Sequence, residues 1–167
     1  NGTSAQQTPW TATEGAHTLY VCADTYNAVA ESNETNNCAS IAFSVAPPLP
    51  DLRAQSLTIS GALTPDTTLT FSGRIRNYGD DAPASTARLC IDNASCATTT
   101  TGSLGEFVTP ALALNAFATH QTTWVATVGT HRFYLCADVG SAVTETSEAN
   151  NCASRAFTIA APVVVPP

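Results

Sequence analysis

The residues with the clearest chemical potential lie in two acidic segments, residues 24–37 and 138–151, each enclosed by a pair of cysteines. Carboxylate and amide oxygens are hard ligands that suit Ca²⁺, which takes roughly six to eight of them. We therefore predict Ca²⁺ as a cofactor bound in these segments. The candidate ligands are Asp24, Asn27, Glu31, Glu34, Asn36, Asp138, Glu145, Glu148 and Asn150.

An alternative without a metal stays open for both segments. Asp and Asn side chains can cap turns through their own backbone, while glutamates such as Glu31 and Glu34 face water. The Asp ladder and central glycine of an EF-hand are missing. The second segment has Ser141 where the first has Asn27, which predicts weaker binding in the second segment.

The two acidic segments belong to an internal repeat. Residues 1–46 align without gaps on residues 115–160 at an offset of 114, and 24 of the 46 positions are identical. A proline-rich junction follows each copy. The repeat predicts four parts: residues 1–46 as the C-terminal half of one domain, 47–50 as a linker, 51–160 as a complete domain, and 161–167 as a linker to a further repeat.

The repeat also selects a pairing for the six cysteines. Cysteines that recur together should pair together, which predicts the disulfides Cys22–Cys38, Cys90–Cys96 and Cys136–Cys152. Closing a loop of this size contributes about 3 kcal/mol in the chain-entropy model. Disulfides indicate an oxidising compartment, so we expect a secreted or cell-surface protein. Zinc is the rival explanation, but the cysteine spacing lacks both the CxxC pattern and histidine partners.

Alternation of apolar and polar residues predicts short strands. Leu69, Phe71, Gly73 and Ile75 share one face of a strand that ends at an Asn-Tyr-Gly turn. Further strands are expected at about 86–92, 119–127, 130–138 and 153–159, and no helix longer than one turn is expected. We predict an all-β fold, an immunoglobulin-like two-sheet sandwich, with a barrel as the second choice.

Composition and motifs argue against several classes of function. The net charge of −7 without a basic cluster makes nucleic-acid binding unfavourable, and the lack of a run of 18 apolar residues makes membrane insertion unfavourable. No nucleophile, metalloprotease or phosphate-binding motif accompanies His17, His120 or His131, so we predict no catalytic residues and no enzyme activity. Trp10 and Trp124 are expected in the core rather than in a sugar-stacking platform.

The acidic segment carries a resemblance to a known family. The pattern Asp-x-x-Asn-x-Val-x-Glu-x-Asn-Glu-x-Asn-Asn from Asp24, preceded by Gly-x-His-x-x-Tyr, resembles the CARDB family, the cell-adhesion-related domain found in bacteria. The turn Asn77-Tyr78-Gly79 is similar to an Asn-x-Gly turn of that family. The resemblance implies an immunoglobulin- or fibronectin-like sandwich, used in tandem on secreted and surface-anchored proteins.

Two functional hypotheses follow from these observations. The first is a structural or adhesive module of a bacterial surface protein, stiffened by disulfides and Ca²⁺ within an extended array or fibre. The alternative is an accessory domain of a secreted hydrolase, which binds substrate or stabilises the enzyme. The partners expected are neighbouring repeats or subunits that complete the half domain 1–46, while the adhesive ligand remains unknown.

Overall fold

The computed structural model describes residues 4–162, which form two compact units. Unit 1 spans Asn1–Pro47 and unit 2 spans Pro48–Pro167. Residues 163–167 of the linker predicted at 161–167 lie outside the described range. Within residues 4–162, no helix has the length and apolar character that a bilayer crossing demands.

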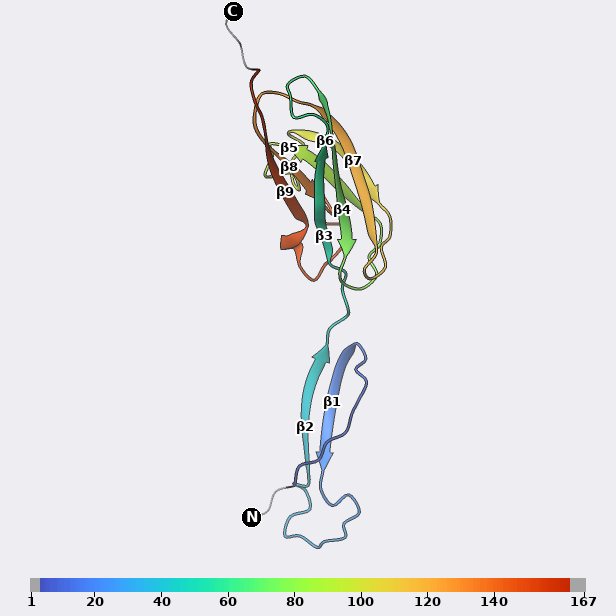
Figure 1. Cartoon of the computed structure of the whole chain (residues 1–167). Coiled ribbons are helices and arrows are strands. Elements are labelled where there is room, and N and C mark those ends of the chain that lie inside the picture. Colours follow the sequence, from blue (N-terminus) through green and yellow to red (C-terminus); the bar gives the residue numbers. More distant parts are fainter. Residues whose placement is uncertain (1–3, 163–167) are drawn as a thin grey trace, which may run out of the picture. The chain divides into compact units, whose positions relative to one another are not determined.

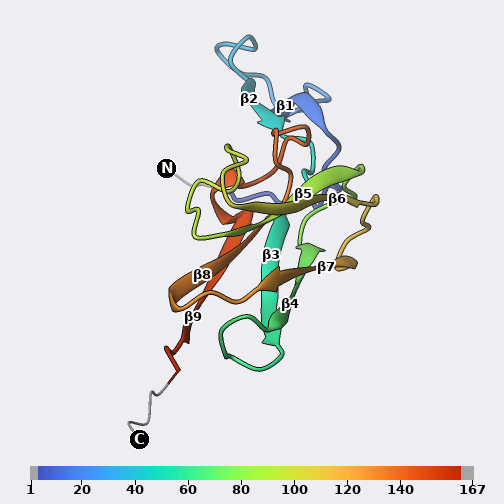
Figure 2. The ribbon, with the colours of Figure 1, turned by 90° about the horizontal axis from the view of Figure 1, so that it is seen from above.

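Unit 2 is a sandwich of two antiparallel sheets (Figures 1 and 2). One sheet has the strand order β3-β4-β7 and the other has the order β6-β5-β8-β9. The strands are β3 (Leu52–Ser60), β4 (Thr68–Asn77), β5 (Ser85–Ile91), β6 (Ser103–Thr109), β7 (Phe117–Val125), β8 (Gly129–Cys136) and β9 (Cys152–Ile159). A short 3-10 turn, η1, covers Glu148–Asn150. The predicted all-β, immunoglobulin-like fold is confirmed.

The inward-facing side chains of β4 form part of the core between the two sheets. Leu69, Phe71, Gly73 and Ile75 are buried as predicted, and Phe71 stacks on Phe133 of β8 with ring centroids 4.7 Å apart. A Cβ atom at Gly73 would lie 2.6 Å from Leu135 Cδ2, so the missing side chain is what lets the sheets approach.

Strands β3 and β6 are the two that the alternation pattern did not predict. The pairing of β3 with β4 shifts register between Gln55 and Thr58, where Ser56 has a φ of 54°. The pairing of β6 with β5 shifts next to Gly105, whose φ is 142°. Each irregularity moves the side chains out of a strict period of two, which removes the signal that identifies a strand.

Asn77, at the end of β4, ties three segments together. Its side chain is fully buried, and its Oδ1 accepts hydrogen bonds from the backbone N–H groups of Asp51 and Gly79, at 3.0 Å each. Its Nδ2 donates to the backbone carbonyls of Asp80 and Leu112, at 2.5 and 2.9 Å. All four hydrogen bonds that a buried Asn can make are therefore formed.

Gly79 makes room for the entry of the chain into unit 2. A Cβ atom at this position would lie 2.3 Å from the Leu49 carbonyl oxygen and 2.6 Å from the Pro50 carbonyl carbon. The same Leu49 oxygen accepts the N–H of Asp80 at 3.0 Å. Leu49 and Pro50, which belong to the linker predicted at 47–50, are thus bound into unit 2.

Unit 1 is built on one hairpin, β1 (Gly15–Cys22) and β2 (Cys38–Val45). The strands pair from Gly15 opposite Val45 to Cys22 opposite Cys38. In unit 2, β8 and β9 pair in the same way, ending with Cys136 opposite Cys152. The hairpin of unit 1 therefore repeats the β8–β9 hairpin of unit 2.

Three disulfides join the six cysteines, and they are the pairs that the repeat predicts. They are Cys22–Cys38, Cys90–Cys96 and Cys136–Cys152, with Cα–Cα distances of 4.1, 5.9 and 4.1 Å. Cys90, Cys96 and Cys136 are fully buried and contact one another in a small cluster on the outer side of β5 and β8.

We predict that Asn77→Ala lowers the free energy of unfolding of unit 2 by about 2 to 4 kcal/mol, because it leaves buried N–H and carbonyl groups unpaired. Urea denaturation followed by circular dichroism would measure the change. Gln121→Ala is the control, since Gln121 lies exposed on β7. A change for Asn77→Ala no larger than that of the control would contradict the role given to Asn77.

Candidate metal centre

The first aspartate of each acidic segment accepts backbone hydrogen bonds that fix the conformation of the loop to which the segment belongs. In the second acidic loop (residues 137–151), Asp138 accepts the backbone N–H groups of Ala142 and Val143, at 3.2 and 2.9 Å. In the first acidic loop (residues 23–37), Asp24 accepts the two equivalent N–H groups at 2.9 Å each. Both aspartates have a φ of 41°. The capping role that the sequence left open is therefore present in both loops.

The second glutamate of each loop also binds within its own loop. Glu148 accepts the N–H of Glu145 at 3.2 Å and the side-chain amide of Asn151 at 3.1 Å. Glu34 accepts the two equivalent donors at 2.8 and 3.2 Å. The two loops thus share one hydrogen-bond pattern, which local sequence alone determines.

Three carboxylates come together in the second acidic loop. Asp138, Glu145 and Glu148 each offer an oxygen atom, and these oxygens lie within 4.8 Å of one another. Asp138 and Glu145 are buried, and Glu148 is exposed. Among the described residues, none of the three takes part in an ion pair. Their hydrogen-bond donors are neutral N–H groups, so no protein cation balances their charge.

Glu145 is the most constrained member of this carboxylate group. Only 7% of its surface is exposed, and it accepts the backbone N–H of Leu52 and, at 3.1 Å, the side-chain amide of Asn151. Burial raises the pKa of Glu145 to about 7, and the negative charges of Glu148 and Asp138 act in the same direction. At neutral pH a large fraction of this carboxyl group therefore carries a proton, and a bound cation would favour its charged form.

The loop holds the start of unit 2. Asn150 Nδ2 donates to Asp51 Oδ1 at 2.8 Å, and the N–H of Thr146 donates to the Pro50 carbonyl at 2.9 Å. Asp51 also pairs with Arg53 at 2.5 Å, which lowers the pKa of the Asp51 carboxyl group. The Asn150 Oδ1 atom is buried without a hydrogen-bond partner, which leaves an amide oxygen for a further donor or an ion.

The structure gathers part of the predicted ligand set. Asp138, Glu145 and Glu148 form the only group of this kind in residues 4–162, whereas the Asn150 side chain donates to Asp51, outside this group. The other five predicted ligands, from unit 1, form no such group: Asp24, Asn27, Glu31, Glu34 and Asn36. The amide count predicts weaker binding in the second segment, whereas among the described residues only the second segment brings three carboxylates together.

Sequence reasoning missed the contribution of the domain's first strand. The Leu52 N–H and the Asp51 carboxylate lie 93 and 99 residues away from their partners in the acidic loop. No local pattern could indicate contacts at that separation. Asn151 was also missed as a donor, although it occupies the last position of the acidic pattern in both copies.

The histidines of unit 2 have structural partners. His131 binds Asp92 Oδ2 through Nδ1 at 2.7 Å and the Thr127 carbonyl through Nε2 at 2.9 Å. His120 is buried and binds Thr109 Oγ1 at 2.9 Å, and burial lowers its pKa. These hydrogen bonds anchor both rings within unit 2.

Comparison with known proteins agrees with this architecture. The chain matches the CARDB family over residues 1–41 and 49–155. A crystal structure of a CARDB domain from Pyrococcus furiosus, in complex with di-metal ions, is similar at a TM-score of 0.56 and 17% identity, covering 67% of this chain and 94% of that one.

A second similar structure is a domain of a putative cell surface protein from Methanosarcina acetivorans. Its TM-score is 0.52 and its identity 22%, and the match covers 66% of this chain and 91% of that one. A search among curated proteins finds no match. The family match extends over most of both repeat copies, and together with the shared fold it shows that this chain belongs to the CARDB family.

Proposed function

We propose that this chain is a non-catalytic structural module of a secreted or surface-anchored protein, in which bound Ca²⁺ fixes the acidic loop to the start of the sandwich. The observation that carries the proposal is the contact between the second acidic loop and residues 50–52. A ligand of the loop therefore acts on the place where the chain enters the domain. An extended array or adhesive stalk requires a rigid connection at the point where the chain enters each domain.

The carboxylate group fits a hard divalent cation. Its candidate ligands are all oxygens, which suit Ca²⁺ better than metals that prefer sulfur or imidazole. The hydrogen bonds described above occupy part of the acceptor capacity of each carboxylate, which leaves further lone pairs for an ion. The related domain from Pyrococcus furiosus was crystallised with two metal ions, which supports a metal function by analogy.

An extracellular location and a tandem arrangement have separate support. Disulfides persist in oxidising compartments, and all six cysteines of this chain are paired. The family match covers both copies of the repeat, in residues 1–41 and 49–155. Modules repeated in this way are suited to serve as spacers or adhesive segments of a larger protein.

We predict that the wild-type chain binds Ca²⁺ at the second acidic loop and that Glu145→Gln weakens binding at least tenfold, because it removes a buried ligand charge. Calorimetric titration of chelator-treated protein at pH 7.5 would measure both. Glu31→Gln is the matched control, since Glu31 occupies the equivalent position in the exposed first loop. Equal weakening by both variants, or no binding by the wild type, would refute the proposed site.

A second prediction concerns pH in the absence of Ca²⁺. Because the pKa of Glu145 is raised to about 7 in the folded protein, the folded state holds this proton more tightly than the unfolded chain, whose pKa is near 4.5. Glu145 then contributes full stability below pH 4.5, and this contribution is lost as the pH rises towards 7. The loss should be on the order of 3 kcal/mol.

Urea denaturation of the wild type and of Glu145→Gln, both in chelator between pH 4 and 8, would isolate this effect. The difference between the two proteins cancels the contribution of other groups, including His120. We expect the variant to become the more stable protein towards pH 8. A pH-independent difference would mean that Glu145 titrates normally in the folded state.

The third prediction concerns stiffening. Bound Ca²⁺ should slow hydrogen exchange at the Leu52 amide, which donates to Glu145. It should not change the exchange rate of amides near Thr68, which lies at the opposite end of β4. Exchange followed by NMR with and without Ca²⁺ would test this. Binding without protection of Leu52 would separate the metal site from the proposed mechanical role.

A further inference from the structure

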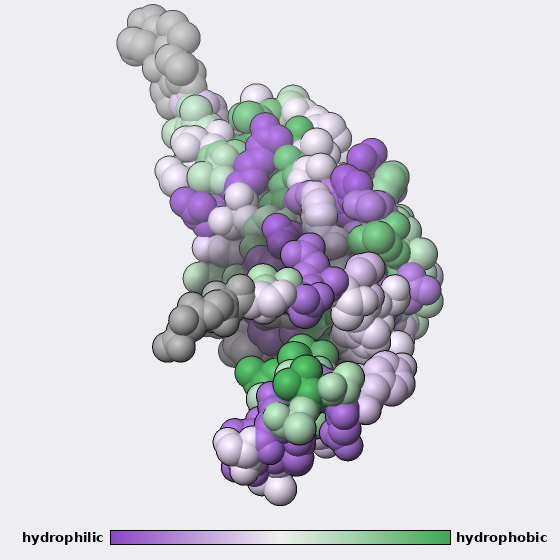
Figure 3. All heavy atoms as spheres, turned by 90° about the horizontal axis from the view of Figure 1, so that it is seen from below, coloured by the Kyte–Doolittle hydropathy of each residue, from purple (hydrophilic) through white to green (hydrophobic). Residues whose placement is uncertain are grey.

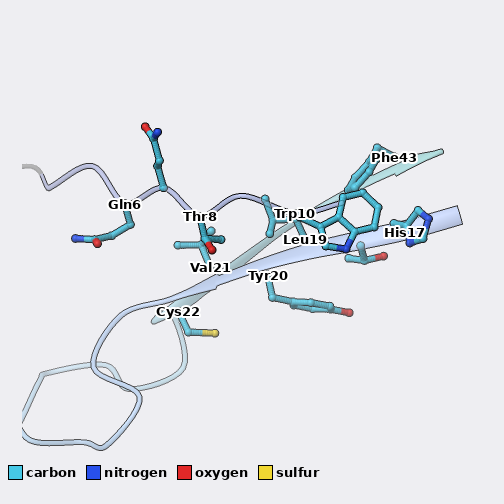
Figure 4. A pocket seen from close by; sticks show the side chains of 11 residues that line it. Gln6, Thr8, Trp10, His17, Leu19, Tyr20, Val21, Cys22 and Phe43 are labelled. Atoms are coloured by element: carbon cyan, nitrogen blue, oxygen red, sulfur yellow. The ribbon is translucent and has the colours of Figure 1, made fainter. Parts of the chain in front are cut away.

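Figure 4 shows the aromatic cluster of unit 1, in which Trp10, His17 and Phe43 lie close together. An equivalent cluster in unit 2 packs against its core. The Trp10 and His17 rings are 4.8 Å apart at 67°, and their equivalents Trp124 and His131 are 4.9 Å apart at 65°. Phe43 lies 5.9 Å from Trp10, as its equivalent does from Trp124. The two hairpins therefore present the same aromatic surface.

The exposure of that surface differs between the units. Trp10 is 54% exposed, Leu19 50% and Val21 58%. The residues equivalent to Leu19 and Val21 are Phe133 and Leu135, which are fully buried. Hydrophobic residues are correspondingly visible at the molecular surface, in green among the purple hydrophilic ones (Figure 3). An apolar sheet face of this kind is a docking surface in need of a partner.

Unit 2 shows what covers the equivalent face. Phe71 of β4 stacks on Phe133 at 4.7 Å and on Trp124 at 5.9 Å, and lies 5.5 Å from Phe157. The edge of the hairpin is covered as well, because β8 pairs with β5 on one side and β9 on the other. In unit 1, β1 pairs only with β2 among the described strands, so its other edge is free.

We infer that unit 1 is the acceptor half of a second sandwich, and that its face and free edge take a half domain with the strand pattern β3–β6 from another repeat. This chain holds one such half, residues 49–114, and two acceptor hairpins. A second copy of the chain could supply this half only by uncovering its own unit 2, at no net gain in buried area. Another repeat is therefore the occupant.

Docking of this half would also bring the carboxylates of the first acidic loop together, as they are in the second. This part of the inference rests on the proposed function. In unit 2, Leu52 at the start of β3 supplies the N–H that Glu145 accepts, and the loop packs against residues 50–52. Glu31 has the same loop around it but is exposed. Half-domain docking and cation binding at unit 1 are then coupled, and each favours the other.

The test adds the missing half to the full chain. A copy of residues 49–114 is joined ahead of Asn1, which preserves the repeat spacing because residue 115 aligns with residue 1. Hydrogen exchange by mass spectrometry should show at least hundredfold stronger protection of residues 15–22 and 38–45 than in the original chain. The matched control carries Phe71→Asp in the added copy only, and should leave both segments as exposed as in the original chain.

Other outcomes have distinct meanings. Unchanged exchange in the extended chain would overturn the inference. Protection in the original chain that rises with concentration, together with dimers in sedimentation, would overturn the choice of occupant in favour of a second copy. Calcium stoichiometry should rise from one site to two on extension. Protection without any Ca²⁺ binding would refute the proposed function and leave the docking inference standing, whereas a constant single site would refute the coupling alone.

Discussion

The architecture of unit 2 depends on two neighbouring backbone groups, the N–H of Asp51 and the N–H of Leu52. The first is bound by the buried side chain of Asn77 and the second by the buried carboxyl group of Glu145. A buried N–H without a partner costs roughly 1 to 3 kcal/mol, so these two side chains fix where β3 begins. Because β3 belongs to one sheet and Glu145 lies in the β8–β9 loop of the other, the contact between Leu52 and Glu145 joins the two sheets at this end, whereas the contact between Asp51 and Asn77 ties the start of β3 to β4 of the same sheet.

The two copies of the acidic loop separate local from long-range determinants. Both loops have the same aspartate conformation and the same glutamate hydrogen bonds, although only one copy is part of a complete sandwich. The conformation is thus local. Burial is not, since Glu145 is 7% exposed and Glu31 is exposed. The raised pKa of Glu145, and with it the capacity to act as a deeply placed ligand, comes from packing against the first strand of the domain.

This division explains how far the sequence could predict the structure. The strand containing Phe71, the hairpins and the cysteine pairs follow from alternation and from the repeat, which are local or duplicated signals. Strands β3 and β6 were missed because bulges at Ser56 and Gly105 disturb the alternation. The candidate ligands are predicted by residue type, but which of the two loops brings its carboxylates together could not be predicted from the segments themselves. Counting amides in the loop ignores Leu52 and Asp51. Their contacts with the loop join residues about one hundred positions apart in the sequence, so they form only when the whole domain folds.

The disulfide and the carboxylate group act on different parts of the same loop. Cys136–Cys152 joins directly opposed residues at the base of the hairpin, and an equivalent bond is present in unit 1. The bond therefore fixes the two ends of the loop in both units, including unit 1, which lacks the second sheet among its described residues. The carboxylate group lies nearer the tip and contacts β3, which the bond does not reach. The disulfide thus closes the loop in both units, but only in unit 2 is the loop also held against the first strand, through the contact between Glu145 and Leu52.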